Sequence, residues 1–253
     1  MLFVIDAGNT NIVGGIFDRG SLVEPLRIRT VTTKTEDEYG VMVRAILNDR
    51  GIELSGVDRV IISSVVPQLS AAMAKMARHL FGVEPAILGP STYGVLPVTV
   101  LAAHEIGSDL VADALAAWTK FRGACIVVDF GTALTFTAVD RNASISGVAI
   151  APGLGTAAGS LSRATAQLPT VPLEAPKSAL GRNTVEAIQA GVVLGYTGLV
   201  NHLVATMKEE LGGAMVVATG GLCRVLADQT DVFDAVEPDL TLQGLALTES
   251  YFF

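Results

Sequence analysis

The sequence predicts an α/β protein made of two related halves. An aspartate with a glycine two residues later occurs twice, in Asp6-Ala-Gly8-Asn9-Thr10 and in Asp129-Phe-Gly131-Thr132. Each copy follows a short apolar run and precedes a strand-like run, so each aspartate is expected where a buried strand ends in a tight turn. A β-meander followed by helices is predicted around both copies. This repeated order indicates a duplicated α/β unit.

The first half is predicted to contain a three-stranded meander followed by alternating helices and strands. Apolar runs and turn residues place strands at 2–5, 12–17, 26–32 and 60–66, and helices at 35–48, 68–80 and 109–121. Thr35, with Glu38 three residues later, is a capping-box pattern that begins the first helix. Met73 and Met76 lie on the apolar face of the second helix, which indicates core packing and no cofactor.

The second half is predicted to repeat this order. Strands are expected at 125–129, 134–139, 144–150 and 214–218. Four helices are expected: one at 155–167, a long one that begins at 184, a short one that ends at 227, and a terminal one that begins at 242. Residues 168–176 are interrupted by prolines and are expected to be an irregular connection. We therefore expect an N-terminal domain at 1–122 and a C-terminal domain at 123–253.

The composition narrows the possible functions. The chain has 253 residues, of which 50% are hydrophobic, and its formal net charge is −8. This acidic balance, without a cluster of lysine and arginine, argues against nucleic-acid binding. Cys125 and Cys223 lie in apolar runs and are expected to be buried free thiols, as in a reducing compartment. The N-terminus has no basic region before its apolar run, so no signal peptide is expected and the protein is predicted to be cytoplasmic.

One apolar segment, 185–207, has the length of a membrane span. Polar residues interrupt it at Glu186, Gln189, Asn201 and His202, so it is not expected to enter a membrane. The sequence instead predicts a buried helix that is hydrophobic on most sides. Because such a helix often forms a subunit interface, we expect a homodimer.

The repeated aspartate motif has the chemistry of a phosphate site. Glycine lets the backbone approach a phosphate, and threonine or asparagine adds donors. Because an aspartate repels phosphate, the motif also implies a cation between them. A third turn, Thr219-Gly220-Gly221, leaves room for a flat ring or a phosphate. Each turn alone is also typical of an ordinary strand end, but together they predict a nucleotide site. Neither the Walker nor the Rossmann glycine pattern is present.

Short motifs follow one another along the whole chain at Asp6 to Thr10, Gly107 to Asp109, Asp129 to Ala133, Pro152 to Leu154, Leu168 to Val171, Gly181 to Thr184 and Ala218 to Leu222. Their order resembles that of type III pantothenate kinases, which belong to the acetate and sugar kinase, Hsp70 and actin superfamily. The resemblance implies two ribonuclease-H-like domains with mixed sheets flanked by helices, ATP between the domains, Mg²⁺, a K⁺ or NH₄⁺ ion and a homodimer. It also implies phosphorylation of pantothenate, the first step of coenzyme A synthesis.

The resemblance assigns roles by position. Asp109 would be the base that takes the proton from pantothenate's hydroxyl, and Asp6 would hold Mg²⁺ through water. Asp129 would bind the monovalent cation. ATP would be contacted by Ala7, Gly8, Asn9, Thr10, Asn11, Thr132, Gly220 and Gly221, together with Asp6. Pantothenate would be contacted by Gly107, Ser108, Leu110 and Thr184, together with Asp109. Asp109 has a purely structural alternative as a helix N-cap.

The acceptor side departs from the family pattern. Val100 stands where the family has an acceptor-binding tyrosine, Leu110 where it has an arginine, and Asp113 where it usually has asparagine. Losing the arginine's charge-assisted bond costs about 1.5–3 kcal/mol, and Asp113 is expected to add repulsion. Arg122, His104, Arg182 or a residue of a second subunit are candidates to replace the cation. Besides the main reading, the alternatives are a kinase for another alcohol and a non-catalytic sensor or regulator that binds ATP.

Overall fold

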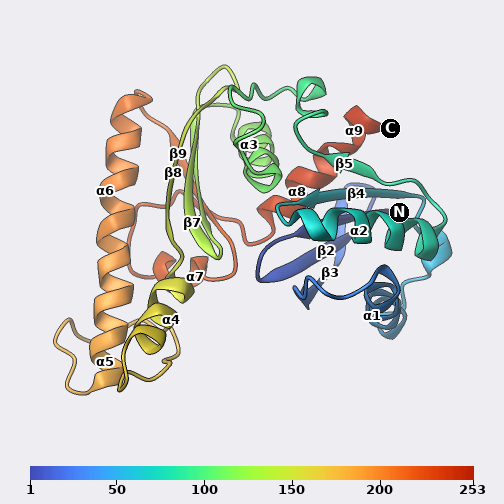
Figure 1. The fold of residues 1–253 in the computed structure, drawn as a ribbon. Helices are drawn as coiled ribbons and strands as arrows, with labels where there is room; N and C mark the ends of the chain where they lie inside the picture. The colour runs from blue at the N-terminus through green and yellow to red at the C-terminus, as the bar shows by residue number, and fades with distance from the viewer. The chain divides into compact units, whose positions relative to one another are not determined.

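Two five-stranded sheets with the same strand order form the framework of the protein (Figure 1). The first has the order β3-β2-β1-β4-β5 and the second the order β10-β9-β6-β7-β8. In each sheet the first three strands along the chain are antiparallel and the last two run parallel to the first. The repeated topology confirms the predicted α/β class and the duplicated ribonuclease-H-like fold.

The computed structural model describes residues 1–253, which form two compact units. The first unit comprises Met1–Ala116 with Thr241–Phe253, and the second comprises Ala117–Leu240. The last two helices thus pack with the first unit. The division into domains at residues 122 and 123 stays a proposal.

The first unit's strands are β1 Leu2–Ala7, β2 Asn11–Asp18, β3 Ser21–Arg29, β4 Arg59–Ser64 and β5 Ala86–Leu88. Its helices are α1 Glu36–Asp49, α2 Pro67–Phe81, the start of α3 Ser108–Phe121, nearly all of α8 Leu240–Leu247, and α9 Glu249–Phe252. The capping box is confirmed, because Thr35 and Glu38 exchange side-chain and backbone hydrogen bonds at the start of α1. The sequence missed β5, an edge strand too short to show periodicity.

The second unit's strands are β6 Cys125–Phe130, β7 Ala133–Val139, β8 Ile145–Pro152, β9 Met215–Thr219 and β10 Ala235–Val236. Its helices are α4 Leu154–Ala164, α5 Thr184–Gln189, α6 Gly195–Glu210 and α7 Cys223–Ala227, with a π-helical segment, Ala190–Leu194, joining α5 to α6. Both cysteines are buried free thiols, as expected. The two-residue β10 was not predicted.

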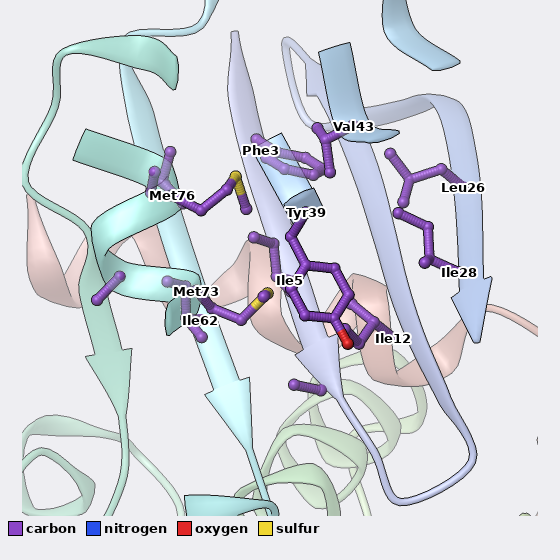
Figure 2. Close-up of a cluster of buried hydrophobic side chains, with 14 of the residues drawn as sticks. Phe3, Ile5, Ile12, Leu26, Ile28, Tyr39, Val43, Ile62, Met73 and Met76 are labelled. Atoms are coloured by element: carbon purple, nitrogen blue, oxygen red, sulfur yellow. The ribbon is translucent and has the colours of Figure 1, made fainter. Parts of the chain in front are cut away.

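The core of the first unit lies between its sheet and helices α1 and α2. Phe3 and Ile5 of β1 face this side, and Tyr39 of α1 and Met73 of α2 point toward them (Figure 2). Met76 is also fully buried, so the predicted core role of the methionines is confirmed. Because side chains alternate along a strand, Asp6 belongs to the opposite face of the sheet.

The long apolar helix is less buried than expected. The continuous helix Thr184–Glu210 is long and apolar enough to cross a membrane by length and composition, and 33% of its apolar window is buried. Val193, Val200 and Val204 face the core, whereas Val185 is exposed. The helix is hydrophobic as predicted, but in the single chain only part of it is buried, in the core that it shares with the sheet and α4 of the second unit.

Candidate active site

The first aspartate motif forms a hairpin turn between β1 and β2. The amide of Gly8 donates to the carbonyl of Asn11 at 3.0 Å, and the Thr30 hydroxyl donates to the Gly8 carbonyl at 2.6 Å. The Thr30 amide also donates to the Thr10 carbonyl at 3.0 Å, so the end of β3 fixes the turn. Asn9 and Thr10 are exposed at its tip, where they are available to a ligand. The Ala7 side chain is buried in the core and offers a ligand only its backbone.

Asp6 is linked to the start of α3 by two serine hydroxyls. Asp6 at the end of β1 pairs with Ser63 on the parallel strand β4. The Ser63 hydroxyl donates to Asp6 Oδ1 at 3.0 Å and lies 2.8 Å from the hydroxyl of Ser108. Ser63 and Ser108 are both buried. The carboxyl ends of parallel strands are the usual place for ligands in α/β sheets.

Asp109 lies in the first turn of α3, directly after Ser108. Its Oδ1 accepts from the amide of Leu110 at 2.9 Å. This bond differs from that of an N-cap, which reaches the amide two or three residues further on. Burial raises the pKa of the Asp109 carboxyl above its ordinary value, against the opposing effect of backbone hydrogen bonds. A carboxylate with a raised pKa is well suited to accept a proton near neutral pH.

Two neighbours shape the surroundings of Asp109. A Cβ on Gly107 would collide with the Asp109 carboxylate, so glycine at this position allows the observed placement. Tyr93 is buried, and its hydroxyl donates to the carbonyl of Ile106 at 3.4 Å. Burial, with a smaller contribution from the charge of Asp109, raises the pKa of Tyr93 to about 12. Tyr93 therefore remains a neutral donor. No sequence pattern pointed to Tyr93, because a lone tyrosine outside a periodic segment is not distinctive.

The positions that depart from the family pattern differ in exposure. Val100 is half-buried, and the Leu110 side chain is buried, so Leu110 offers a ligand only its backbone. Asp113 is completely buried, and its Oδ1 accepts from the Thr241 hydroxyl of α8 at 2.7 Å. Its charge is therefore directed into the contact between α3 and α8. The expected repulsion of an acidic substrate by Asp113 is not supported by this geometry.

The second aspartate motif has a comparable register in the second unit. Asp129 pairs with Thr219 on β9 and with Thr135 on β7, which puts the three side chains on one face of the sheet. The hydroxyl oxygens of Thr135 and Thr219 are buried and have no hydrogen-bond partner. Buried hydroxyls without partners are uncommon in native proteins and call for an explanation such as an ion. A carboxylate with neutral oxygens beside it is the donor set that hard cations prefer.

Gly220 has a structural role in this arrangement. Its φ is +88°, and a Cβ would collide with the Asp129 carboxylate and the backbone of Phe130. The side of Gly220 on which a Cβ would lie is thus filled by the protein's own chain, and the contact of Gly220 with ATP stays a prediction. Gly221 beside it is exposed and remains available to a ligand.

Thr132 is exposed at the tip of the second turn, as a phosphate contact requires. Its carbonyl accepts from the Gly153 amide at 3.0 Å and from the Thr156 hydroxyl at 2.6 Å. The first turn of α4 therefore fixes this loop, as the end of β3 fixes the loop of the first unit.

Thr184 lies at a separate place in the second unit. It lines a cavity of about 800 Å³ together with Arg182, Ile188 and Tyr196, and the lining does not include Asp129, Thr132 or Gly220. A Cβ on Gly181 would collide with the backbone of Ala187, so the chain before α5 packs directly on that helix. The Arg182 side chain forms no ion pair and is exposed.

The chain contains no cluster of three or more histidine, cysteine, aspartate or glutamate side chains that could hold a metal ion by themselves. A single carboxylate such as Asp6 nevertheless fits Mg²⁺, because Mg²⁺ in kinases is held by one or two carboxylates, water and the phosphates of the nucleotide.

The family model and the relatives in sequence agree on one family. The model of the family described as type III pantothenate kinase matches residues 2–206. The type III pantothenate kinase of Treponema pallidum is 45% identical over 252 residues, which cover 97% of this chain and 92% of the relative. The type III pantothenate kinase of Exiguobacterium sibiricum is 39% identical over 247 residues, with 98% of each chain covered.

Solved structures show the same fold at lower identity. A Campylobacter jejuni protein described as a Baf family transcriptional activator has a TM-score of 0.60 at 18% identity, and the match covers 98% of each chain. A Sinorhizobium meliloti protein described as a 2-dehydro-3-deoxygalactonokinase has a TM-score of 0.59 at 12% identity, with 100% and 97% covered. These likenesses concern the fold alone. The family match and the sequence relatives show that this chain is a kinase belonging to the type III pantothenate kinase family.

Proposed function

We propose that this protein transfers the γ-phosphoryl group of ATP to the primary hydroxyl of pantothenate, giving 4'-phosphopantothenate and ADP. The observation on which the proposal rests is the placement of Asp109. It is a carboxylate with a raised pKa in the first turn of α3, and its chain neighbour Ser108 is hydrogen-bonded to Ser63, which in turn donates to Asp6. A base and a cation-binding carboxylate held in one unit are the parts that phosphoryl transfer to an alcohol needs.

In this mechanism Asp109 accepts the proton of the acceptor hydroxyl. The hydroxyl oxygen then bonds to the γ-phosphorus, the bond from that phosphorus to the β,γ-bridging oxygen breaks, and ADP leaves. We assign phosphate contacts to the exposed turn residues Asn9, Thr10 and Thr132. Mg²⁺, held near Asp6 through water, would neutralise phosphate charge when bound.

The direct test of this proposal is a coupled assay of ADP release with and without pantothenate. We expect turnover that requires ATP, Mg²⁺ and pantothenate. Turnover with another alcohol but not with pantothenate would favour the divergent kinase. ATP binding in calorimetry without turnover would favour the sensor, and no finding at present favours either alternative.

A monovalent cation site at Asp129 is part of the proposal. The support is the row of Thr135, Asp129 and Thr219 on one face of the sheet, with two buried hydroxyls that lack partners. We expect K⁺ or NH₄⁺ to raise both activity and the melting temperature, because a ligand that binds only the folded state stabilises it.

Thr219→Val tests this site. Valine keeps the shape but removes the hydroxyl oxygen, so we expect the concentration of K⁺ needed for half-maximal activation to rise about tenfold, the effect of one lost bond to a charged group. Without K⁺ the variant should be at least as stable as the parent, because the unpaired hydroxyl is gone. Melting curves in KCl and in choline chloride at equal ionic strength measure both effects. An unchanged response to K⁺ would contradict the role of Thr219.

Arg182 is our candidate for the cation that meets the carboxylate of pantothenate. It lines the same cavity as Thr184 and has no ion pair within the protein. Arg182→Ala is expected to raise the KM for pantothenate about 10- to 100-fold, from the loss of one charge-assisted bond. The kcat and the KM for ATP should change little. Arg141, outside the lining of this cavity, provides the control variant Arg141→Ala, and equal KM values in both variants would exclude Arg182.

The cellular setting and assembly complete the proposal. The acidic chain with two buried free thiols supports a cytoplasmic enzyme. The exposed side of the helix Thr184–Glu210 carries Val185, which supports its use in a homodimer. Sedimentation equilibrium measures the oligomeric state directly, and a dimer mass is expected.

A further inference from the structure

The hydrogen-bond chain between Asp6 and α3 has a fixed direction. Ser63 has one hydroxyl proton, and it is donated to Asp6 Oδ1 at 3.0 Å. An ionised carboxylate can only accept. Ser63 must therefore accept in its 2.8 Å contact with Ser108, and Ser108 is the donor. The order is Ser108 to Ser63 to Asp6, with both hydroxyls satisfied and both serines buried.

This chain does not follow from the strand register alone. The second unit has the same parallel pairing, with Asp129 opposite Thr219 as Asp6 is opposite Ser63. There the equivalent hydroxyl, that of Thr219, is buried without a hydrogen-bond partner. The hydroxyl of Ser63 therefore makes two hydrogen bonds that its counterpart Thr219 does not make in the second unit.

The position of Ser63 in an apolar strand supports a role beyond packing. Val60, Ile61 and Ile62 precede it in β4 and are all completely buried. A hydroxyl at this depth costs free energy unless it is hydrogen-bonded. Both of its bonds lead to groups beside the proposed chemistry, one to the carboxylate near Mg²⁺ and the other to the residue before the base.

We propose that Ser63 is a positioning residue, which fixes the distance and orientation between Asp6 and the start of α3, and so places Asp109 relative to the phosphate-binding turn. The role rests on the proposed function of Asp6 and Asp109. Ser63 itself touches neither substrate. It acts by holding Oδ1 of Asp6 in one orientation and the first turn of α3 in one place.

Three variants test the role of Ser63. Ser63→Ala removes both bonds, Ser63→Thr keeps the hydroxyl, and Ser108→Ala removes only the link to α3. For Ser63→Ala we expect amide hydrogen exchange in 107–111 to accelerate about 2- to 10-fold without any ligand, since the hydrogen bond from Ser108 is lost. The calorimetric affinity for Mg²⁺ with a non-hydrolysable ATP analogue should fall about tenfold, and kcat about 10- to 100-fold. The KM for pantothenate should change little.

The other variants separate the effect of the bond from Ser63 to Asp6 from that of the bond from Ser108 to Ser63. Ser63→Thr should restore most of the nucleotide affinity and kcat. Ser108→Ala should accelerate exchange in 107–111 while it leaves nucleotide affinity near that of the parent, because Ser63 still donates to Asp6. Ser70→Ala is the matched control. The Ser70 hydroxyl lies in α2, and its one contact, at 3.5 Å, is with a carbonyl of Val66, so all these quantities should stay as in the parent.

The outcomes distinguish this proposal from the proposed function. Parent-like exchange in 107–111 in both Ser63→Ala and Ser108→Ala would overturn the positioning role, whatever the substrate is. If the parent protein shows no pantothenate-dependent turnover, the proposed function fails, while hydrogen exchange and nucleotide affinity still test the link. If Ser63→Ala does not fold, Ser108→Ala and Ser63→Thr carry the test.

Discussion

Asp109→Asn is expected to lower kcat about 10²- to 10⁴-fold, the usual contribution of a general base. Asparagine keeps a carbonyl oxygen that can accept from the amide of Leu110, as Oδ1 of Asp109 does at 2.9 Å. The start of α3 should therefore be preserved. Steady-state kinetics with pantothenate and ATP measure the loss, and ATP affinity should remain near that of the parent.

The pH dependence of the parent enzyme follows from the same residue. Because burial raises the pKa of Asp109, kcat/KM should fall on the acid side with an apparent pKa above the ordinary value of an aspartate, as the base becomes protonated. Asp109→Asn should lose this acid limb in its residual activity.

Asp109→Asn should raise the stability of the folded protein at neutral pH, although it lowers activity. A carboxyl whose pKa is raised in the folded state contributes most below its unfolded-state pKa, and this contribution is lost as the pH rises through the folded-state pKa. At neutral pH ionised Asp109 therefore costs stability. Asp109→Asn should have a higher melting temperature than the parent at neutral pH, and the difference should shrink in acid.

Glu105→Gln is the control for these measurements. Glu105 is an exposed carboxylate in the loop before α3, so its loss should leave kcat and the melting temperature almost unchanged. An Asp109→Asn protein with near-parental kcat would exclude Asp109 as the base. A lower melting temperature at neutral pH would show that its carboxylate is structurally required, as the N-cap alternative assumes.

Gly220→Ala is expected to destabilise the protein by about 2–5 kcal/mol. The left-handed backbone at φ +88° costs an alanine about 1–2 kcal/mol. The added Cβ would also collide with Asp129 and the backbone of Phe130, and forced overpacking costs typically 1–3 kcal/mol. For a protein of this size, a loss in this range lowers the melting temperature by roughly 5–15 °C. Urea unfolding and thermal melting measure both quantities.

Gly212→Ala separates the backbone cost of a positive φ from the cost of the Cβ collision. Gly212 has φ +65°, and nothing lies within 4 Å of the position of its Cβ, so alanine there meets only the backbone cost. The difference between the two variants gives the effect of the collision. Equal destabilisation would mean that the close approach of Asp129 and Phe130 to Gly220 is unimportant. Gly220→Ala should also weaken the response to K⁺, because the Asp129 carboxylate must move.

Much of the fold was predictable because local pattern and tertiary structure agree. Thr35 and Glu38 cap α1 as the sequence indicates, and this is a contact between residues close in the chain. The repeated aspartate turns follow from a buried run ended by glycine. The short strands β5 and β10 were not predictable, since their pairing is provided by distant neighbours in the sheet.

The surroundings of the site were less predictable. Asp113 was expected to affect the acceptor, but it accepts from Thr241, far along the chain in α8. A tight turn was expected at Gly220, but its close approach to Asp129 and Phe130 was not. Tyr93 gave no signal, although its hydroxyl contacts the loop before Asp109. In each case the partner is remote in sequence, so no local pattern contains it.

The sequence by itself determined the duplicated α/β class, the family and the identity of Asp6, Asp109 and Asp129 as the candidate carboxylates, because motifs and periodicity are local properties of the chain. The tertiary structure alone decided what these carboxylates contact. Parallel pairing of β1 with β4 puts Ser63 beside Asp6, and the packing of α3 brings Ser108 to Ser63. Hydrogen bonds between segments depend on strand register and helix packing, and these are settled only when the whole unit folds.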